Sequence, residues 1–433
     1  MHVPTNKVHV DRKEVRAALF PTESGPIIRS RLQNDFYCYP MGAFASHFYR
    51  DVEVTMGFTN RTRSVRLAEE VREEDLRREL NHTMNLPYAD DEVEYIEKVQ
   101  NEGKPMFRNE YGSDLRDSKL PPYNLTVQDG QFRLTSKGRW HEVMDWEMPM
   151  LTTISALRTE ALMKQKTRAG QDEVVEYTAR AIEHKAEVLE QHPRVKCSDF
   201  GTRRAASPLL QRILVGTMAE HLNPGQFVGT SNVALARELS LKPSGTVGHL
   251  PEMVLGALAN DDDELLQVRI KLLRQWWELF GHGLSIILPD AFGSNWMFKH
   301  LTEEFARDWK GMRQDSMDPY EFGEKQIKWY QRHGQDPRDH LLIPSDGLTL
   351  DSMLAITYHF IDRIDVSSGP GTMFTNDTSL GHLSMVVKAM LANGRPCVKL
   401  SDNLAKGLGL KSEQERYARV FDYDVLRNEA CVV

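Results

Sequence analysis

The sequence predicts an α/β protein in which a barrel of parallel strands follows a smaller N-terminal α/β layer. From about residue 150 onward, short apolar or β-branched runs end in polar, Gly-rich clusters, and helix-like segments usually follow them. Strand–loop–helix repeats produce parallel strands joined by crossover helices. Seven such units in one region favour a closed or nearly closed barrel over an open sheet. Residues 27–150 instead mix short strand and helix signals, which is typical of a small separate layer.

The bulk composition is that of an ordinary globular protein. The chain has 433 residues, of which 40% are hydrophobic and 27% charged, with a net charge of −8. This length predicts roughly two to three domains, and the lack of a strongly basic stretch argues against nucleic-acid binding. No apolar run is long enough to span a membrane, and the four cysteines show no Cys-x-x-Cys spacing. We therefore expect a cytoplasmic protein without a zinc site of the usual spacing.

The N-terminal part predicts an extension and a small domain. Residues 1–26 are expected to be a polar extension ahead of the folded part, and residues 27–150 to form the first domain. β-branched content, alternation and recurring apolar positions predict its elements. These are strands at 52–58, 128–134 and 140–146, a helix at 65–80, and a turn at 136–138.

The barrel domain is predicted over residues 151–402, followed by a C-terminal segment, 403–433. It opens with a helical stretch at 152–189 that is almost free of Gly and Pro. Loops after the carboxyl ends of barrel strands build the active sites of such folds. The polar clusters in these positions lie at 198–204, 229–232, 244–249, 289–293, 313–316, 345–347 and 367–372. That Gly, Asp and Ser simply make turns is the alternative for any one loop, but it explains seven in register poorly.

Two of these clusters have the composition of phosphate-binding loops. Backbone N–H groups of Gly-rich loops and helix N-termini attract anions. Arginines in neighbouring clusters can pair bidentately with phosphate or carboxylate oxygens, with a structural ion pair as the alternative. The candidates are Ser345, Asp346, Gly347, Gly369, Gly371 and Thr372 in the loops, together with Arg203, Arg204 and Arg313.

Carboxylates and one histidine complete the candidate chemistry. Asp290, Asp315 and Asp346 can hold Mg²⁺ or stabilise positive charge on a reacting sugar, unless they are helix N-caps. His249 follows a Gly-Thr-Val-Gly segment and could act as a base, a phosphate ligand or a phosphorylated nucleophile, although a lone histidine is more often structural. Together these residues predict a barrel enzyme that handles a phosphorylated or diphosphorylated substrate with Mg²⁺.

The motifs, taken in order along the chain, resemble those of the nicotinate phosphoribosyltransferase family over about residues 30–410. The matching segments are 32–37 with Met41, 138–140, 146–149, 199–204, 229–232, 242–246, 374–377, 387–388 and 399–402. The resemblance implies an irregular (β/α) barrel of the type II phosphoribosyltransferase kind with an N-terminal α/β sandwich domain. It also implies an enzyme that joins nicotinate to phosphoribosyl diphosphate, giving nicotinate mononucleotide and diphosphate. That reaction would be coupled to ATP through a phosphohistidine and would serve NAD salvage.

The resemblance also implies roles for particular residues. Tyr37 and Phe200 would sandwich the pyridine ring, with Tyr37 donated across the interface of a homodimer that shares its active site. His249 would be the histidine phosphorylated from ATP. Further substrate-binding residues would be Arg203, Arg204, Thr230, Ser231 and Asn232. Catalysis would involve Arg313, Asp290 and Asp315, with both aspartates as possible Mg²⁺ ligands. The loops at Ser345–Gly347 and Gly369–Thr372 would bind the 5′-phosphate.

Several positions depart from the family's usual pattern, and they leave two alternatives open. Leu250-Pro251 follows His249, Met317 and Pro370 occupy phosphate-site loops, and Cys38 and Ala205 flank the expected base site. One alternative is a divergent paralogue that acts on another aromatic acid or phosphorylated substrate in specialised metabolism. The other is a non-catalytic barrel that binds a ligand, since Met317 and Pro370 would obstruct phosphate placement.

Overall fold

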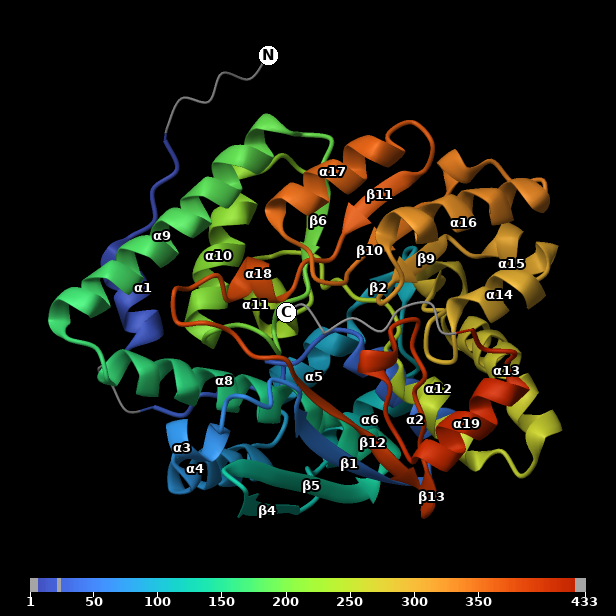
Figure 1. Ribbon diagram of the computed structural model, residues 1–433, viewed down its shortest axis with the longest axis horizontal. Coiled ribbons are helices and arrows are strands. Elements are labelled where there is room, and N and C mark those ends of the chain that lie inside the picture. The colour runs from blue at the N-terminus through green and yellow to red at the C-terminus, as the bar shows by residue number, and fades with distance from the viewer. Residues whose placement is uncertain (1–6, 22–24, 425–433) are drawn as a thin grey trace.

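The computed structural model describes residues 7–21 and 25–424. Figure 1 shows a barrel of parallel strands with its helices above an antiparallel sheet, with the N-terminal helix α1 lying against α9. Among the described residues, no helix is long and apolar enough to cross a membrane. The α/β fold class predicted from the sequence is confirmed.

The barrel contains six parallel strands in the order β7-β6-β11-β10-β9-β8. They are β6 Lys196–Asp199, β7 Phe227–Thr230, β8 Ile286–Ile287, β9 Gly311–Gln314, β10 Leu341–Pro344 and β11 Asp365–Ser368. The seventh predicted unit forms no strand and contributes a single bridge between Pro243 and Thr230. Proline has no N–H to extend a ladder, so the barrel stays open between β7 and β8.

Helices connect the barrel strands and cover them. They are α10 Pro208–His221, α11 Val233–Glu238, α12 Leu250–Leu258, α13 Asp262–Phe280, η2 Gly281–Leu284, α14 Ser294–His300, α15 Glu303–Asp308, α16 Pro319–Arg332, η3 Pro337–Asp339, α17 Leu350–Phe360 and α18 Thr372–Thr375. The helical stretch predicted at 152–189 is confirmed, and it consists of two helices, α8 Glu147–Lys164 and α9 Arg168–Gln191. Thr167 caps the second helix, since its hydroxyl accepts a hydrogen bond from the Gly170 N–H.

The antiparallel sheet has the order β13-β12-β1-β5-β4 and draws on both ends of the chain. Its strands are β1 Glu53–Asn60, β4 Tyr123–Gln128, β5 Gln131–Arg139, β12 Met385–Ala392 and β13 Arg395–Pro396. In Figure 1 the red strand β12 lies alongside the blue strand β1, with which it pairs. The assignment of residues 151–402 entirely to the barrel is therefore wrong for β12 and β13.

The remaining helices and a small hairpin lie around this sheet or against α13 and the barrel. They are α2 Cys38–Phe48, α3 Leu67–Glu70, α4 Glu73–Met84, α5 Asp90–Glu97, β2 Gln100–Asn101, β3 Lys104–Pro105, α6 Asn109–Asp117, α7 Trp140–Val143, η1 Met144–Trp146, η4 Leu404–Lys406 and α19 Lys411–Val420. The helix predicted at 65–80 is thus two helices, α3 and α4. The strand predicted at 140–146 is helical, because Trp140, Val143 and Met144 are buried at helical spacing.

The turn predicted at 136–138 is also wrong, since these residues lie within β5. The Ser136 hydroxyl donates to the Pro122 carbonyl oxygen at 3.0 Å. A Cβ atom at Gly138 would lie 2.4 Å from the Pro121 side chain. The glycine is therefore present for a close approach to a proline and not for a turn.

Residues 7–21 are not a polar extension ahead of the folded part. Helix α1 Arg12–Leu19 buries Val15 and Leu19 completely, and Val10 just before it is buried as well. Arg12 forms ion pairs with Glu176 and Glu183 on α9. This segment is therefore an integral layer over α9.

Candidate active site

One cavity lies at the carboxyl ends of the barrel strands, where the sequence placed the site. The predicted site residues that line it are Tyr37, Phe200, Arg203, Arg204, Ser231, His249, Arg313, Asp315, Ser345, Asp346, Gly347, Gly369, Gly371 and Thr372. Tyr37 of the same chain lines the cavity together with Phe200. One chain therefore supplies both aromatic rings, and the predicted sharing of the site between two subunits stays a prediction.

Three predicted site residues do not line the cavity. Thr230 donates a hydrogen bond to Asp199 at 2.6 Å, and Asn232 donates one to Gln211 at 2.9 Å. Both side chains are buried beneath the cavity, so the structure places them in a supporting network. Asp290 is buried behind His249 and Lys399, both of which line the cavity and contact its carboxylate.

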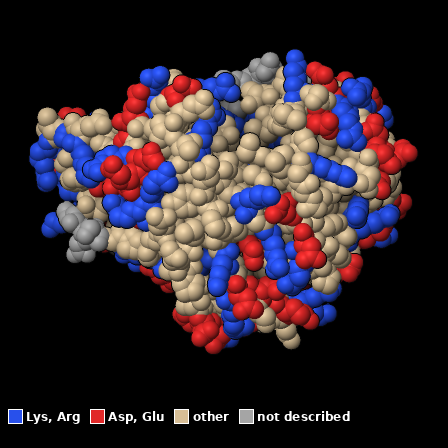
Figure 2. Space-filling view, turned by 90° about the horizontal axis from the view of Figure 1, so that it is seen from below, with Lys and Arg blue, Asp and Glu red and all other residues tan. Residues whose placement is uncertain are grey.

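Cations dominate the cavity wall. Besides Arg203, Arg204 and Arg313, it contains Arg61, Lys388, Lys399 and Lys406, against the carboxylates of Asp35, Asp315 and Asp346. On the face of the molecule in Figure 2, basic and acidic side chains are instead interspersed around a broad uncharged area. The cavity is therefore a place where positive charge is gathered for an anionic ligand.

Arg204 illustrates this excess of positive charge. Its Nη1 donates to the Leu383 carbonyl oxygen at 3.5 Å, and the described residues form no ion pair with it. Burial, together with the neighbouring Arg203 and Arg61, lowers the pKa of Arg204 to about 9. It stays charged at neutral pH, and an anion beside it would relieve the repulsion.

At one end of the cavity, a buried carboxylate holds two of the cations. Glu147 Oε1 accepts from Arg203 Nη1 at 3.1 Å and from Lys388 Nζ at 2.9 Å. Although burial acts to raise it, the two cations hold the pKa of Glu147 below its usual value. Glu147 thus balances only one of the two cations next to Tyr37, and the Asp35 carboxylate on the same wall already accepts a hydrogen bond from Ser231.

The glycine loop after β11 fixes the position of Phe200. The Phe200 N–H donates to the Pro370 carbonyl oxygen at 2.9 Å. A Cβ atom at Gly369 would lie 2.3 Å from the Phe200 ring. The loop predicted as a phosphate cradle therefore also packs closely against the aromatic ring.

At the other end of the cavity, Lys406 joins two loops of the barrel. Its ammonium donates to the Asp315 carbonyl oxygen at 2.7 Å and contacts the Asp346 carboxylate. Arg61 in turn donates to the Lys406 carbonyl oxygen at 3.1 Å. Gly347, beside Asp346, has a φ of +57° and so takes a backbone conformation that favours glycine.

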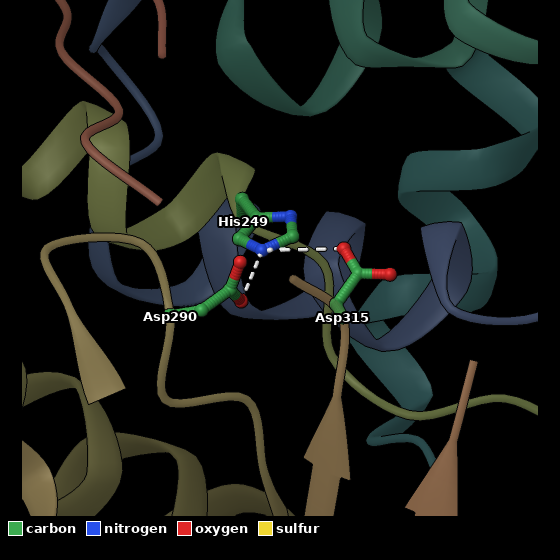
Figure 3. Close-up of side chains that lie close together, drawn as sticks. All are labelled: His249, Asp290 and Asp315. Atoms are coloured by element: carbon green, nitrogen blue, oxygen red, sulfur yellow. Dashed lines mark hydrogen bonds and ion pairs between the residues drawn. The ribbon is translucent and has the colours of Figure 1, made fainter. Parts of the chain in front are cut away.

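His249 lies between two carboxylates at the edge of the cavity (Figure 3). Its Nε2 is 2.6 Å from Asp290 Oδ1 and 3.6 Å from Asp315 Oδ2. Burial lowers the pKa of His249 to about 4, despite the opposing attraction of both carboxylates. At neutral pH the imidazole is therefore neutral, and a proton on Nε2 donated to Asp290 leaves the lone pair on Nδ1.

Asp290 is held on every side. Ser316 donates to its Oδ2 at 2.7 Å, Ser401 does so at 3.3 Å, and Lys399 Nζ lies 3.4 Å away. Although burial acts to raise it, His249 and Lys399 hold the pKa of Asp290 well below its usual value. The residue is an ionised acceptor that orients the histidine.

The His249, Asp290 and Asp315 ligand atoms lie within 4.8 Å of one another, which is a spacing that could hold a metal ion. Mg²⁺ prefers oxygen ligands and keeps several waters. Asp290 fits this role poorly because its oxygens already accept several bonds. Asp315 fits better, because it lines the cavity and Arg313 and Lys406 keep its pKa low against the opposing effect of burial.

Sequence reasoning missed several residues of the site. Asp35, Lys388 and Lys399 lie within the motif segments given above, but the sequence did not indicate that their side chains line the cavity. Lys406 lies in the predicted C-terminal segment, and no local signal marks it. Arg61 directly follows β1 in the sheet, outside the barrel repeats, and it also lines the cavity.

The departures from the family's usual pattern lie outside the cavity wall. Met317 and Cys38 are buried, and neither lines the cavity. The Ala205 carbonyl oxygen accepts from Ser155 at 2.7 Å. Pro370 likewise does not line the cavity. Neither the Met317 nor the Pro370 side chain forms part of the cavity wall, but Pro370 lies between two residues that do and has no N–H to offer a phosphate.

A barrel of parallel strands with a cationic, aromatic cavity at its carboxyl end defines an α/β-barrel enzyme. Two family models identify which kind. The N-terminal domain model of nicotinate phosphoribosyltransferase matches residues 32–155, and the model of the nicotinate phosphoribosyltransferase family matches residues 195–425. The chain belongs to the nicotinate phosphoribosyltransferase family.

Solved structures agree with this assignment. The chain is similar to a nicotinate phosphoribosyltransferase from Vibrio cholerae, with 27% identity, a TM-score of 0.83, and coverage of 94% of this chain and 96% of that one. It also matches a nicotinate phosphoribosyltransferase from Porphyromonas gingivalis, with 24% identity, a TM-score of 0.81, and coverage of 92% and 100%. The second match supports the fold alone.

Proposed function

We propose that this enzyme joins nicotinate to phosphoribosyl diphosphate, giving nicotinate mononucleotide and diphosphate. The observation that supports this most is the set of groups that line one cavity. An aromatic pair, Tyr37 and Phe200, and the Arg203–Lys388 cations share it with the Ser345–Gly347 loop and Arg204. A pyridine carboxylate and a phosphosugar require those groups together.

The residues divide the reaction between them. Tyr37 and Phe200 would hold the pyridine ring, and Arg203 with Lys388 would pair with its carboxylate. The ring nitrogen forms a bond to the ribose C1 while the bond from C1 to the diphosphate oxygen breaks. Asp315 would stabilise positive charge on the ribose, and Arg313 would stabilise negative charge on the departing diphosphate.

Mg²⁺ would accompany the diphosphate beside Asp315 and neutralise part of its charge. Ser345, Asp346, Gly347 and Thr372 would surround the 5′-phosphate, with Lys406 and Arg204 supplying cations. In this assignment Asp290 orients His249 and does not bind the metal. In this proposal Asp315 is therefore the one aspartate that contacts Mg²⁺.

We propose further that ATP transfers its γ-phosphoryl group to His249, and that this couples ATP hydrolysis to synthesis. A neutral imidazole with one nitrogen held by Asp290 is a competent acceptor. Service in NAD salvage, a cytoplasmic location and a homodimer follow from the family resemblance and remain predictions. Analytical ultracentrifugation tests the homodimer directly.

The test is product formation from nicotinate, phosphoribosyl diphosphate and Mg²⁺, with and without ATP, read by mass spectrometry. We expect nicotinate mononucleotide, formed faster with ATP. His249→Gln should keep the ATP-independent rate and lose the stimulation, because the glutamine Nε2 can still donate to Asp290 but accepts no phosphoryl group. A folded wild-type protein that forms no nicotinate mononucleotide, yet converts another aromatic acid in parallel reactions, would establish the divergent paralogue instead.

A further inference from the structure

Arg269 of α13 is a buried guanidinium whose contacts converge on the His249–Asp290 pair. Its side chain is completely buried. Its Nε donates to Glu252 Oε1 at 2.7 Å, its Nη1 donates to the Gly293 carbonyl oxygen at 2.9 Å, and its Nη2 donates to the Pro289 carbonyl oxygen. All three nitrogens are therefore engaged, and each is directed to a different part of the chain.

The two carbonyl groups lie on either side of Asp290. Pro289 directly precedes that residue, and Gly293 follows it by three positions, with its own N–H bonded to the Asp290 carbonyl oxygen at 3.2 Å. One planar guanidinium thus fixes both ends of the short loop that carries the carboxylate. Rotation of this loop would move Asp290 relative to His249.

Glu252 connects the same guanidinium to the histidine. His249 is the N-cap residue of α12, and its carbonyl oxygen accepts from the Met253 N–H at 3.1 Å. Glu252 lies three residues after His249, on the same face of the helix. Arg269 therefore joins the helix that begins after His249 to the loop that carries Asp290.

Stability alone does not account for a completely buried ion pair here. Removing two charges from water is costly, and apolar side chains of similar volume often stabilise a core as well or better. The surroundings are aromatic: the ring centroids of Trp296 and Phe421 lie 5.1 Å and 5.8 Å from the guanidinium carbon. The charged fork instead provides directed bonds to two backbone carbonyl groups, which apolar side chains could not provide.

We propose that Arg269, oriented by Glu252, is a positioning residue that sets the geometry of the His249–Asp290 hydrogen bond. The inference rests on the proposed phosphorylation of His249. Arg269 does not line the cavity, so it acts through the loop and the helix and touches no substrate. Its loss should change the chemical step at His249 without changing how substrates bind.

The main test variant is the double substitution Glu252→Met and Arg269→Met, which replaces the pair by apolar side chains of similar length. We expect phosphohistidine formation and ATP-dependent kcat to fall about 10- to 100-fold. KM for nicotinate and for phosphoribosyl diphosphate should stay within about twofold. Glu252→Gln keeps an acceptor for Nε and should retain most of the ATP-dependent rate.

Two further variants separate positioning from folding. Arg269→Lys keeps the buried charge but lacks the planar fork, and we expect the same selective loss of ATP-dependent kcat. Arg274 is exposed on the same helix, and Arg274→Met is the matched control with unchanged kinetics. A double variant that folds and forms phosphohistidine at the wild-type rate would overturn the proposal. So would an equal decline of the ATP-independent and ATP-dependent rates that follows the loss of folded protein in both variants.

A spectroscopic measurement does not depend on turnover. In ¹⁵N-histidine NMR spectra, assigned with His249→Asn, the wild type should show His249 with its proton on Nε2. The folded Arg269→Lys variant should show a mixture of tautomers or a displaced signal. An unchanged His249 signal would count against the positioning role even if the wild type formed nicotinate mononucleotide. If no nicotinate mononucleotide were formed, a displaced signal would still support the geometry while the proposed function failed.

Discussion

Lys388 and Arg203 share one carboxylate oxygen of Glu147, and this sharing leaves a positive charge for a substrate carboxylate. We expect Lys388→Met to raise the KM for nicotinate by about 10-fold or more, because hydrogen bonds to charged groups contribute about 1.5–3 kcal/mol. The KM for phosphoribosyl diphosphate should change little. Steady-state kinetics with each substrate varied in turn provide the measurement. Lys137→Met on β5 is the control, since that lysine is 63% exposed. An unchanged nicotinate KM would place the carboxylate elsewhere.

Arg313 is a second cation of the cavity wall that could bind an anionic substrate. Its Nη1 donates to Thr246 at 2.7 Å, while its buried Nε has no partner in the described residues. We expect Arg313→Ala to lower kcat/KM for phosphoribosyl diphosphate at least about 100-fold, with little change in folding. Arg338→Ala, at a side chain 69% exposed, provides the comparison. Normal turnover in Arg313→Ala would show that the diphosphate lies elsewhere.

Residues within the strand-end loops were predictable, whereas those outside the repeats were not. Phe200, Arg313 and the two glycine loops follow strands, so their convergence followed from topology. Arg61, Lys388 and Lys406 come from the sheet and the C-terminal segment. No periodicity in the sequence relates these segments to the barrel. Only the three-dimensional packing brings their cations to the cavity.

At the scale of elements, helix α1 makes a measurable contribution to stability. Leu19 is buried among α1's neighbours at 1% exposure, so Leu19→Ala should lower the free energy of unfolding by about 2–5 kcal/mol. Chemical denaturation measures the change. Lys13→Ala, at an exposed position of the same helix, should change it by less than about 0.5 kcal/mol. Activity at a temperature where both variants are folded should be unaffected, because α1 does not line the cavity. Equal stability of the two variants would show that the packing of α1 contributes nothing.

The errors in predicting elements have a common cause. The segment 140–146 contains tryptophans and a valine, which favour strands, but its buried positions have helical spacing. Gly138 and Ser136 suggested a turn, although they allow β5 to pass close to Pro121 and Pro122. Composition alone does not distinguish these cases, because tertiary packing decides them.

At the scale of the whole molecule, the neutral state of His249 makes stability depend on pH. Its pKa is about 4 when folded, against 6.5 as the ordinary value. The unfolded chain therefore takes up the proton first, so the contribution is complete above about pH 6.5 and is lost as the pH falls toward about 4. His249→Gln, which keeps a donor for Asp290, should lack this loss. Urea unfolding of both proteins between about pH 7.5 and pH 5 should show the wild type losing up to about 1.4 kcal/mol per pH unit relative to the variant. Parallel pH profiles would mean that folding does not change the pKa of His249, and a wild type that gained stability as the pH falls would mean that His249 is charged in the folded state.

The barrel was predictable as a whole because the same strand–loop–helix unit repeats along the sequence, with a polar cluster after each predicted strand. Its opening between β7 and β8 was not, since a proline at position 243 interrupts a segment whose composition otherwise fits the repeat. The shared sheet was also not predictable. Pairing between β1 and β12 joins segments from opposite ends of the chain, and no local pattern specifies such a partner.

That pairing has a consequence for how the protein is made. Until β12 leaves the ribosome, β1 has β5 on one side only, and its other edge presents unpaired N–H and C=O groups. At roughly 5–20 residues per second, translation keeps that edge exposed for tens of seconds. A nascent chain of this protein is therefore a natural client for chaperones that bind strand edges. A fragment ending before Met385 would be expected to aggregate, however well its own helices form.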